Sequence, residues 1–215
     1  MKYHVFDRTK GMVRVFLLVC LFTFLPLSIS AQLVALDYEG RDSAYVETIK
    51  SRAQKVVDGL QLDDKKTARN VRNIIANRYF LLNDIHSKYD KNQQAERDAE
   101  LYKHHFELAS ALSVYLTEDQ IDAVKDGMTY GRLKRDYQAT LDMIPTLSDF
   151  EKQQILIWLR EAREYAMDAA DSKGKHFWFD KYRGRTNNWL SARGYDLKKE
   201  RENWMKRIED AKKNE

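Results

Sequence analysis

The chain has 215 residues and a formal net charge of +4. This length allows one large domain or two small ones, and so small a charge excludes a polycation that binds nucleic acid through bulk electrostatics. The single cysteine, Cys20, lies in a segment that we expect to be removed. The mature protein is therefore expected to contain no disulfide, no cysteine zinc site and no catalytic thiol.

Residues 1–31 have the pattern of a secretory signal peptide. Four basic residues precede an apolar run from Val15 to Ile29, and small residues follow before the cleavage site expected after Ala31. An uncleaved anchor is the alternative, but the apolar run is short for a membrane span. We therefore expect a periplasmic or secreted protein with no membrane span after cleavage.

Apolar residues at three- and four-residue spacings predict helices through most of the remaining chain. The first three helices are expected at residues 43–59, 63–89 and 101–115. Arg78 and His105 interrupt the apolar stripes of the second and third. A buried arginine needs a carboxylate, and a buried histidine needs a hydrogen-bond partner. Arg78 and His105 therefore either line a pocket or form an internal ion pair and a satisfied core histidine.

Two capping boxes mark the next helix starts. Thr117 with Gln120, and Ser148 with Glu151, have the spacing in which each side chain caps the other residue's backbone. They predict helices at about 117–128 and 148–169, with a helix at 133–144 between them that ends before Pro145. Further helices are expected at 173–196, where Gly184 can introduce a bend, and at 197–212.

The helices predict an all-α, single-domain bundle of six to seven amphipathic helices over residues 43–215, after the signal peptide and an N-terminal tail at 32–42. The sequence lacks the HExxH, GxSxG, P-loop and GxGxxG motifs, and its histidines lack metal-ligand spacing. These features favour a non-catalytic protein with no cofactor and no metal, although they do not decide whether it is an enzyme.

Four carboxylates are spaced along one face of the helix at 148–169 and just beyond it. They are Glu161, Glu164, Asp168 and Asp171. Two of them can act as acid and base if a groove holds them beside a sugar bond. Alternatively, they form a solvated face that pairs with neighbouring cations.

The segment Lys173–Asp196 joins aromatic, basic and amide side chains. Its six basic and two acidic residues give it a charge of +4, so the rest of the mature chain is slightly acidic. Three rings are expected to stack on a sugar, namely Trp178, Tyr182 and Trp189. Five side chains are expected to donate hydrogen bonds to it: Lys181, Arg183, Arg185, Asn187 and Asn188. The arginines favour an acidic sugar.

Two alternatives remain open for the same segment. Its rings can be core residues with the cations extending to solvent at the rim. It can also form a hairpin with the preceding acidic helix, in which the two partners satisfy each other. Only groups left exposed by that pairing can bind a ligand.

Several motifs in order resemble one protein family. They lie at Lys125–Tyr130, Ile144–Leu147, Ala162–Ala169 and Lys181–Ser191. The family comprises exported helical proteins of unknown function, mainly from polysaccharide-degrading Gram-negative bacteria, and is catalogued as candidate sugar-binding proteins. The resemblance extends from about Ser43 to Trp204. It implies a periplasmic or secreted protein that works beside glycan-degrading enzymes, and it transfers no catalytic residue.

Three functions follow from these patterns. The first is non-catalytic binding of a carbohydrate, including an acidic glycan, in polysaccharide utilisation. The second is a periplasmic chaperone-like or interaction protein, because Leu116–Gln120 matches the LTxxQ pattern of small periplasmic chaperones. The third is a glycan-active enzyme whose carboxylates must face a pocket about 5–10 Å apart. The residues expected to line such a pocket are Arg78, His105, Glu161, Glu164, Asp168 and His176.

Overall fold

A computed structural model describes residues 33–213, and residues 34–215 form one compact unit. The predicted signal peptide and Cys20 lie outside the described residues. The described residues form helices and connecting turns without strands, which confirms the all-α class. None of the helices within residues 33–213 combines the length and apolarity needed to cross a membrane.

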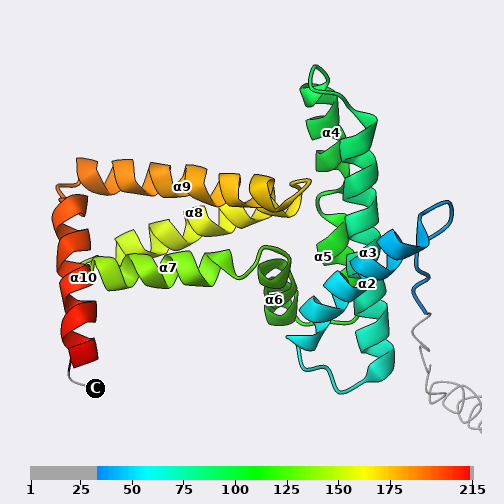
Figure 1. Cartoon of the computed structure of the whole chain (residues 1–215), viewed down its shortest axis with the longest axis horizontal. Coiled ribbons are helices and arrows are strands. Elements are labelled where there is room, and N and C mark those ends of the chain that lie inside the picture. Colours follow the sequence, from blue (N-terminus) through cyan, green and yellow to red (C-terminus); the bar gives the residue numbers. More distant parts are fainter. Residues whose placement is uncertain (1–32, 214–215) are drawn as a thin grey trace, which may run out of the picture. The chain divides into compact units, whose positions relative to one another are not determined.

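Nine helices occupy the part of the chain that the structure describes (Figure 1). Their bounds are α2 Ser43–Asp58, α3 Lys65–Lys88, α4 Gln94–His104, α5 Glu107–Leu112, α6 Glu118–Met128, α7 Arg132–Met143, α8 Asp149–Met167, α9 Ser172–Ala192 and α10 Leu197–Lys213.

The third predicted helix differs most from the structure. It begins at Gln94 rather than Leu101, and it is divided into α4 and α5 at His105 and Phe106. Residues 94–100 are rich in strong helix formers, which extend the helix although they add no apolar stripe. The nine helices of the described residues exceed the six to seven predicted, and this division accounts for one of the additional helices without changing the fold class.

The predicted helix starts rest on side-chain caps. Both capping boxes are present, Thr117 with Gln120 and Ser148 with Glu151, as predicted. The α9 helix continues through Gly184 and ends before Gly194, whose φ of +95° is left-handed. The N–H of Tyr195 donates to the carbonyl of Leu190 at 3.2 Å, which completes a glycine-terminated helix cap and turns the chain into α10.

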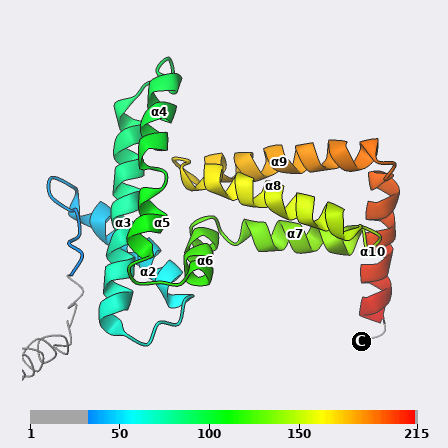
Figure 2. The same ribbon diagram turned by 180° about the vertical axis from the view of Figure 1, so that it is seen from behind.

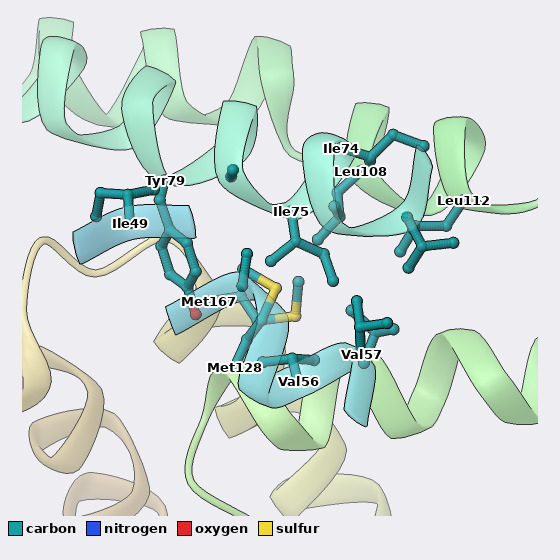
Figure 3. Packing of buried hydrophobic residues seen from close by; sticks show 14 of the residues in the cluster. Ile49, Val56, Val57, Ile74, Ile75, Tyr79, Leu108, Leu112, Met128 and Met167 are labelled. Carbon is teal, nitrogen blue, oxygen red and sulfur yellow. The ribbon is translucent and has the colours of Figure 1, made fainter. Parts of the chain in front are cut away.

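The first hydrophobic cluster joins α2, α3, α5 and α6. Figure 3 shows α2 and α3 side chains, among them Val56 and Ile75, packed against Leu112 of α5 and Met128 of α6. Met167, the last residue of α8, lies among them and is buried. Met167 therefore ties α8 to a cluster that is otherwise built from the preceding helices.

The second hydrophobic cluster is formed by α7, α8 and α9. Its buried centre includes Ile155, Leu159, Phe179 and Leu190. The α10 helix crosses the ends of these helices in both views (Figures 1 and 2) and has no buried residue. The guanidinium of Arg207 donates to the last carbonyls of α7, at 2.6 Å to that of Asp142, and so fixes α10 against α7.

The tail predicted at 32–42 lies along α3 where it is described. Three asparagines on one face of α3 bind it: Asn70 accepts from the N–H of Val34 at 3.0 Å, and Asn73 donates to the Val34 carbonyl at 2.8 Å. Asn77 accepts from the N–H of Asp37 at 2.9 Å. These amides satisfy backbone groups that have no partner within the tail.

Candidate functional site

A pocket of about 600 Å³ opens between α3 and α4 on one side and α8 and α9 on the other. We call it the aromatic pocket. Five aromatic side chains line it: Tyr102, Phe106, Tyr165, Phe177 and Trp178. The polar lining consists of His86, Gln94, Arg97, Asp98, His105, Glu161, Glu164 and Asp168. A pocket of this size matches the volume of sites for small molecules.

The rim of the aromatic pocket exposes large apolar rings. Tyr102 is 70% exposed, Phe106 66% and Phe177 58%, although such rings are usually at least half buried. The rings of Tyr102 and Phe106 meet edge to face, with centroids 6.2 Å apart. These three rings are free to contact a ligand.

Trp178 is less available than its neighbours. Its ring stacks on Tyr165 with centroids 4.5 Å apart, and the ammonium group of Lys181 lies 4.8 Å from its centroid. Tyr165 covers one face of the ring, and Lys181 and Phe177 also lie against it. Trp178 therefore forms part of the pocket wall and leaves less of its ring for a ligand than the exposed rings do.

The floor of the aromatic pocket is organised around Asp168, the residue that ends α8. Its carboxylate accepts from the guanidinium of Arg78 at 2.5 Å and pairs with Nδ1 of His105 at 2.7 Å. The Asp168 carbonyl lies 2.7 Å from Nε2 of His86. The two polar side chains that interrupt apolar helix stripes, Arg78 and His105, thus share one carboxylate.

This arrangement favours the protonated form of His105. The hydrogen bond that His105 donates to Asp168 raises the pKa of His105, against the opposing effect of burial. The other ring nitrogen, Nε2, faces the carboxylate of Glu164 at 3.7 Å. The imidazole therefore lies between two carboxylates, and both stabilise its positive charge.

Glu164 is in turn held by cations from α6 and from its own helix, α8. Lys125 of α6 donates to its two oxygens at 2.9 and 3.0 Å. Arg163, which is buried, lies 3.5 Å from Glu164 and forms closer ion pairs with Asp122 and Asp126. These pairs connect α6 with α8, so the polar floor is rigid and its charges are balanced. Within residues 33–213, no three histidines or carboxylates are grouped so as to hold a metal ion.

The rings predicted to stack on a sugar do not form one surface. The Tyr182 side chain is buried, and its pKa is raised by burial and by a hydrogen bond to Glu161. Trp189 packs edge to face on Trp158 of α8, with centroids 5.2 Å apart. Of the three predicted rings, only Trp178 lines the aromatic pocket.

The predicted hydrogen-bond donors are also divided among several places. Arg185 covers Trp158, with its guanidinium 4.6 Å from the ring, and lies 3.5 Å from Glu161. Arg183 and Asn187 line a second pocket beside α10, whereas Asn188 is exposed. His176 lies outside both pockets, where its Nδ1 is 2.8 Å from a guanidinium nitrogen of Arg132.

Sequence reasoning did not assign Tyr102, Phe106, Tyr165 and Phe177 to the site. A signal was nevertheless present, since Tyr102 and Phe106 are four residues apart but lie off the apolar stripe that contains Leu101 and Leu108. Aromatic residues outside the buried stripe of a helix are expected to be exposed. The sequence alone did not show that rings from separate helices meet.

The fold and the site define a class: all-helical proteins with a pocket that has aromatic walls and a floor of paired charges. The chain belongs to the family described as a protein of unknown function, DUF3826, which matches residues 46–210. A search of curated proteins finds no match.

Proposed function

We propose that this protein is exported and binds a saccharide in the aromatic pocket without chemically changing it. The proposal rests on one observation: three exposed aromatic side chains, Tyr102, Phe106 and Phe177, line a pocket that has a polar floor. A pyranose has apolar faces that stack on flat rings and hydroxyls that need hydrogen-bond partners. The aromatic pocket offers both kinds of surface.

The polar lining supplies partners for hydroxyl groups. Glu161 already bonds Tyr182 and Arg185, and Asp98 accepts from Arg97 and Gln94, but each carboxylate has further lone pairs that can accept from a hydroxyl. The side-chain carbonyl of Gln94 is a further acceptor in the lining. Because Asp168 and Glu164 are already paired with cations, the floor offers no excess positive charge. The aromatic pocket therefore fits a neutral sugar better than an acidic one.

Calorimetry of the purified protein with a panel of neutral oligosaccharides tests the proposal. Phe106→Ala removes an exposed ring from the pocket and is expected to weaken binding about tenfold, which corresponds to about 1.4 kcal/mol. Phe150→Ala is the matched control, because Phe150 is 61% exposed and lies outside the pocket. Absence of binding at millimolar sugar, or equal losses in both variants, would overturn the proposal.

The same exposed rings support a second candidate, a chaperone-like protein that binds apolar peptide segments. This function predicts that the protein suppresses aggregation of an unfolded client and that Phe106→Ala weakens the suppression. Saccharide binding predicts no effect on aggregation. The two functions are therefore separated by one light-scattering assay with the same variant.

Catalysis by the helix carboxylates is less well supported. Glu161, Glu164 and Asp168 all line the aromatic pocket, as an enzyme would require. However, Asp168 accepts hydrogen bonds from Arg78 and pairs with His105, and Glu164 accepts from Lys125. Carboxylates whose oxygens are occupied in this way are poorly placed to exchange protons with a sugar.

A further inference from the structure

A second pocket, which we call the C-terminal pocket, lies among α7, α8, α9 and α10 and has a volume of about 450 Å³. Its floor is apolar and includes Met143, Ile155 and Leu159, and one wall is the half-buried ring of Trp204. The saccharide site proposed above does not include it. The two pockets share no residue.

The C-terminal pocket is rich in positive charge. Arg183, Lys198 and Arg201 line it. The only acidic lining residue is Asp136, whose Oδ2 accepts from two guanidinium nitrogens of Arg132 at 2.9 and 3.0 Å. Arg183 has one exposed partner, Asp180, at 3.0 Å. Neither Lys198 nor Arg201 forms an ion pair within residues 33–213.

An amide completes the polar lining. Asn187 lies in the pocket wall, is half-buried, and makes no side-chain hydrogen bond to any other described residue. Its planar amide therefore presents both donors and an acceptor to whatever enters. The pocket thus brings the amide of Asn187 together with the unpaired cations Lys198 and Arg201 and the indole of Trp204.

The pocket is formed before any ligand arrives. Arg207 holds α10 to the end of α7 through the carbonyls of Asp142 and Met143. The turn before α10 is fixed by Glu151, which accepts from Arg193 at 2.7 Å and from the Tyr195 hydroxyl at 2.9 Å. A preformed site loses less entropy on binding than one that must be ordered.

We propose that the C-terminal pocket binds a uronic acid residue of an acidic oligosaccharide. Its carboxylate pairs with Lys198 and Arg201, the apolar face of its ring stacks on Trp204, and Asn187 bonds a ring hydroxyl. The unpaired cations call for an anionic group, and the carboxylate is the anionic group that a sugar ring itself carries in a uronic acid. The choice of a sugar ring rests on the proposed function, since Trp204 would also accept another flat or apolar ring.

Competing ligands use only part of this site. An inorganic anion satisfies the cations but leaves Trp204 and the apolar floor uncovered. A neutral sugar covers the ring but leaves two cations unpaired in the pocket. The groups of the pocket therefore fit a carboxylated ring better than they fit an inorganic anion or a neutral sugar.

Calorimetry with a galacturonic acid trimer, the matching galactose trimer and inorganic sulfate tests the proposal. The acidic trimer is expected to bind at least tenfold more tightly than the neutral trimer at this pocket, and to weaken as salt is added. Lys198→Ala with Arg201→Ala should lower its affinity at least tenfold. Trp204→Ala should also weaken it, whereas Lys206→Ala, an exposed cation elsewhere on α10, should not.

Three results would overturn the proposal. They are equal affinity for the acidic and neutral trimers in the Phe106→Ala variant, whose aromatic pocket is weakened, equal affinity for the acidic trimer in the double variant and in Lys206→Ala, and displacement of the acidic trimer by sulfate at equal concentration. Far-ultraviolet circular dichroism checks that each variant is folded, and Lys198→Glu gives an independent charge change at an exposed position.

Phe106→Ala should leave uronate binding intact. If neutral sugars lose binding in Phe106→Ala and uronate does not bind at all, only this inference fails; if uronate binds and neutral sugars do not, only the saccharide function of the aromatic pocket fails.

Discussion

Lys175, in the first turns of α9, is expected to destabilise the folded protein. Its side chain is 5% exposed, and its ammonium group has no hydrogen-bond partner. The ring of Tyr79 lies 5.9 Å from the ammonium nitrogen, and Asp168 and Asp171 only partly offset the cost of burying the charge. Burial, followed by repulsion from Arg52, lowers the pKa of Lys175 from 10.5 to about 8. A group whose pKa falls on folding binds its proton less tightly in the native state, so the charge opposes folding.

The size of the effect follows from that shift. A pKa lowered to about 8 corresponds to roughly 3 kcal/mol between the charged and neutral forms, because each unit is worth about 1.4 kcal/mol. The full cost is present below pH 8, where the amine is charged in both states. Between pH 8 and 10.5 the native state loses its proton first, so the wild-type protein gains stability relative to any variant without the charge.

Lys175→Met keeps the length of the side chain and removes the charge. At pH 7 the free energy of unfolding is expected to rise by about 2–3 kcal/mol, or roughly 4–12 °C in Tm for a domain of this size. Urea unfolding at pH 7 and at pH 9.5 measures it, and the gain should shrink at the higher pH. The control is Lys173→Met on the same helix, which is exposed. A variant that is less stable than wild type at pH 7, or a gain independent of pH, would refute the reasoning.

Three further predictions concern stability and are checked by the same unfolding measurement. Gly184→Ala should stabilise the protein by about 0.5–1 kcal/mol, because Gly184 lies inside α9 and a Cβ there meets open space. Gly127→Ala should destabilise it instead, since its Cβ would approach Cγ1 of Val56 to 2.9 Å. Asp168→Asn should lower the free energy of unfolding by about 3–5 kcal/mol, because it leaves the buried guanidinium of Arg78 without its carboxylate. A loss below 1 kcal/mol would show that the contacts of Asp168 with Arg78 and His105 contribute little to stability.

Most of the fold was predictable because local signals and periodicity agree with it. The capping residues Thr117 and Ser148 mark helix starts through bonds made within one turn, so they act without tertiary context. The break at His105 was not predictable, because neither glycine nor proline marks it. There the side chain of His105 turns to Asp168, a residue 63 positions away in the sequence.

The segment Lys173–Asp196 shows why the site was harder to predict than the fold. Trp178 and Trp189 do share one face of α9, but they are eleven positions apart, which is about 16.5 Å along the axis at 1.5 Å per residue. That face packs on α8, where Tyr165 meets Trp178 and Trp158 meets Trp189. Periodicity indicates which residues share a face, and it does not indicate that a neighbouring helix will cover them.

The two hydrophobic clusters meet at the charges that floor the aromatic pocket. Arg78 and His105, from the first group of helices, both reach Asp168 at the end of α8, and Lys125 reaches Glu164. The floor is thus required for stability whether or not a ligand binds, and substitutions there change folding and binding together. The exposed rings are expected to contribute little to folding stability, since Tyr102 and Phe106 are 70% and 66% exposed. Loss of binding in a ring variant of unchanged stability is therefore the result that separates a binding site from a structural junction.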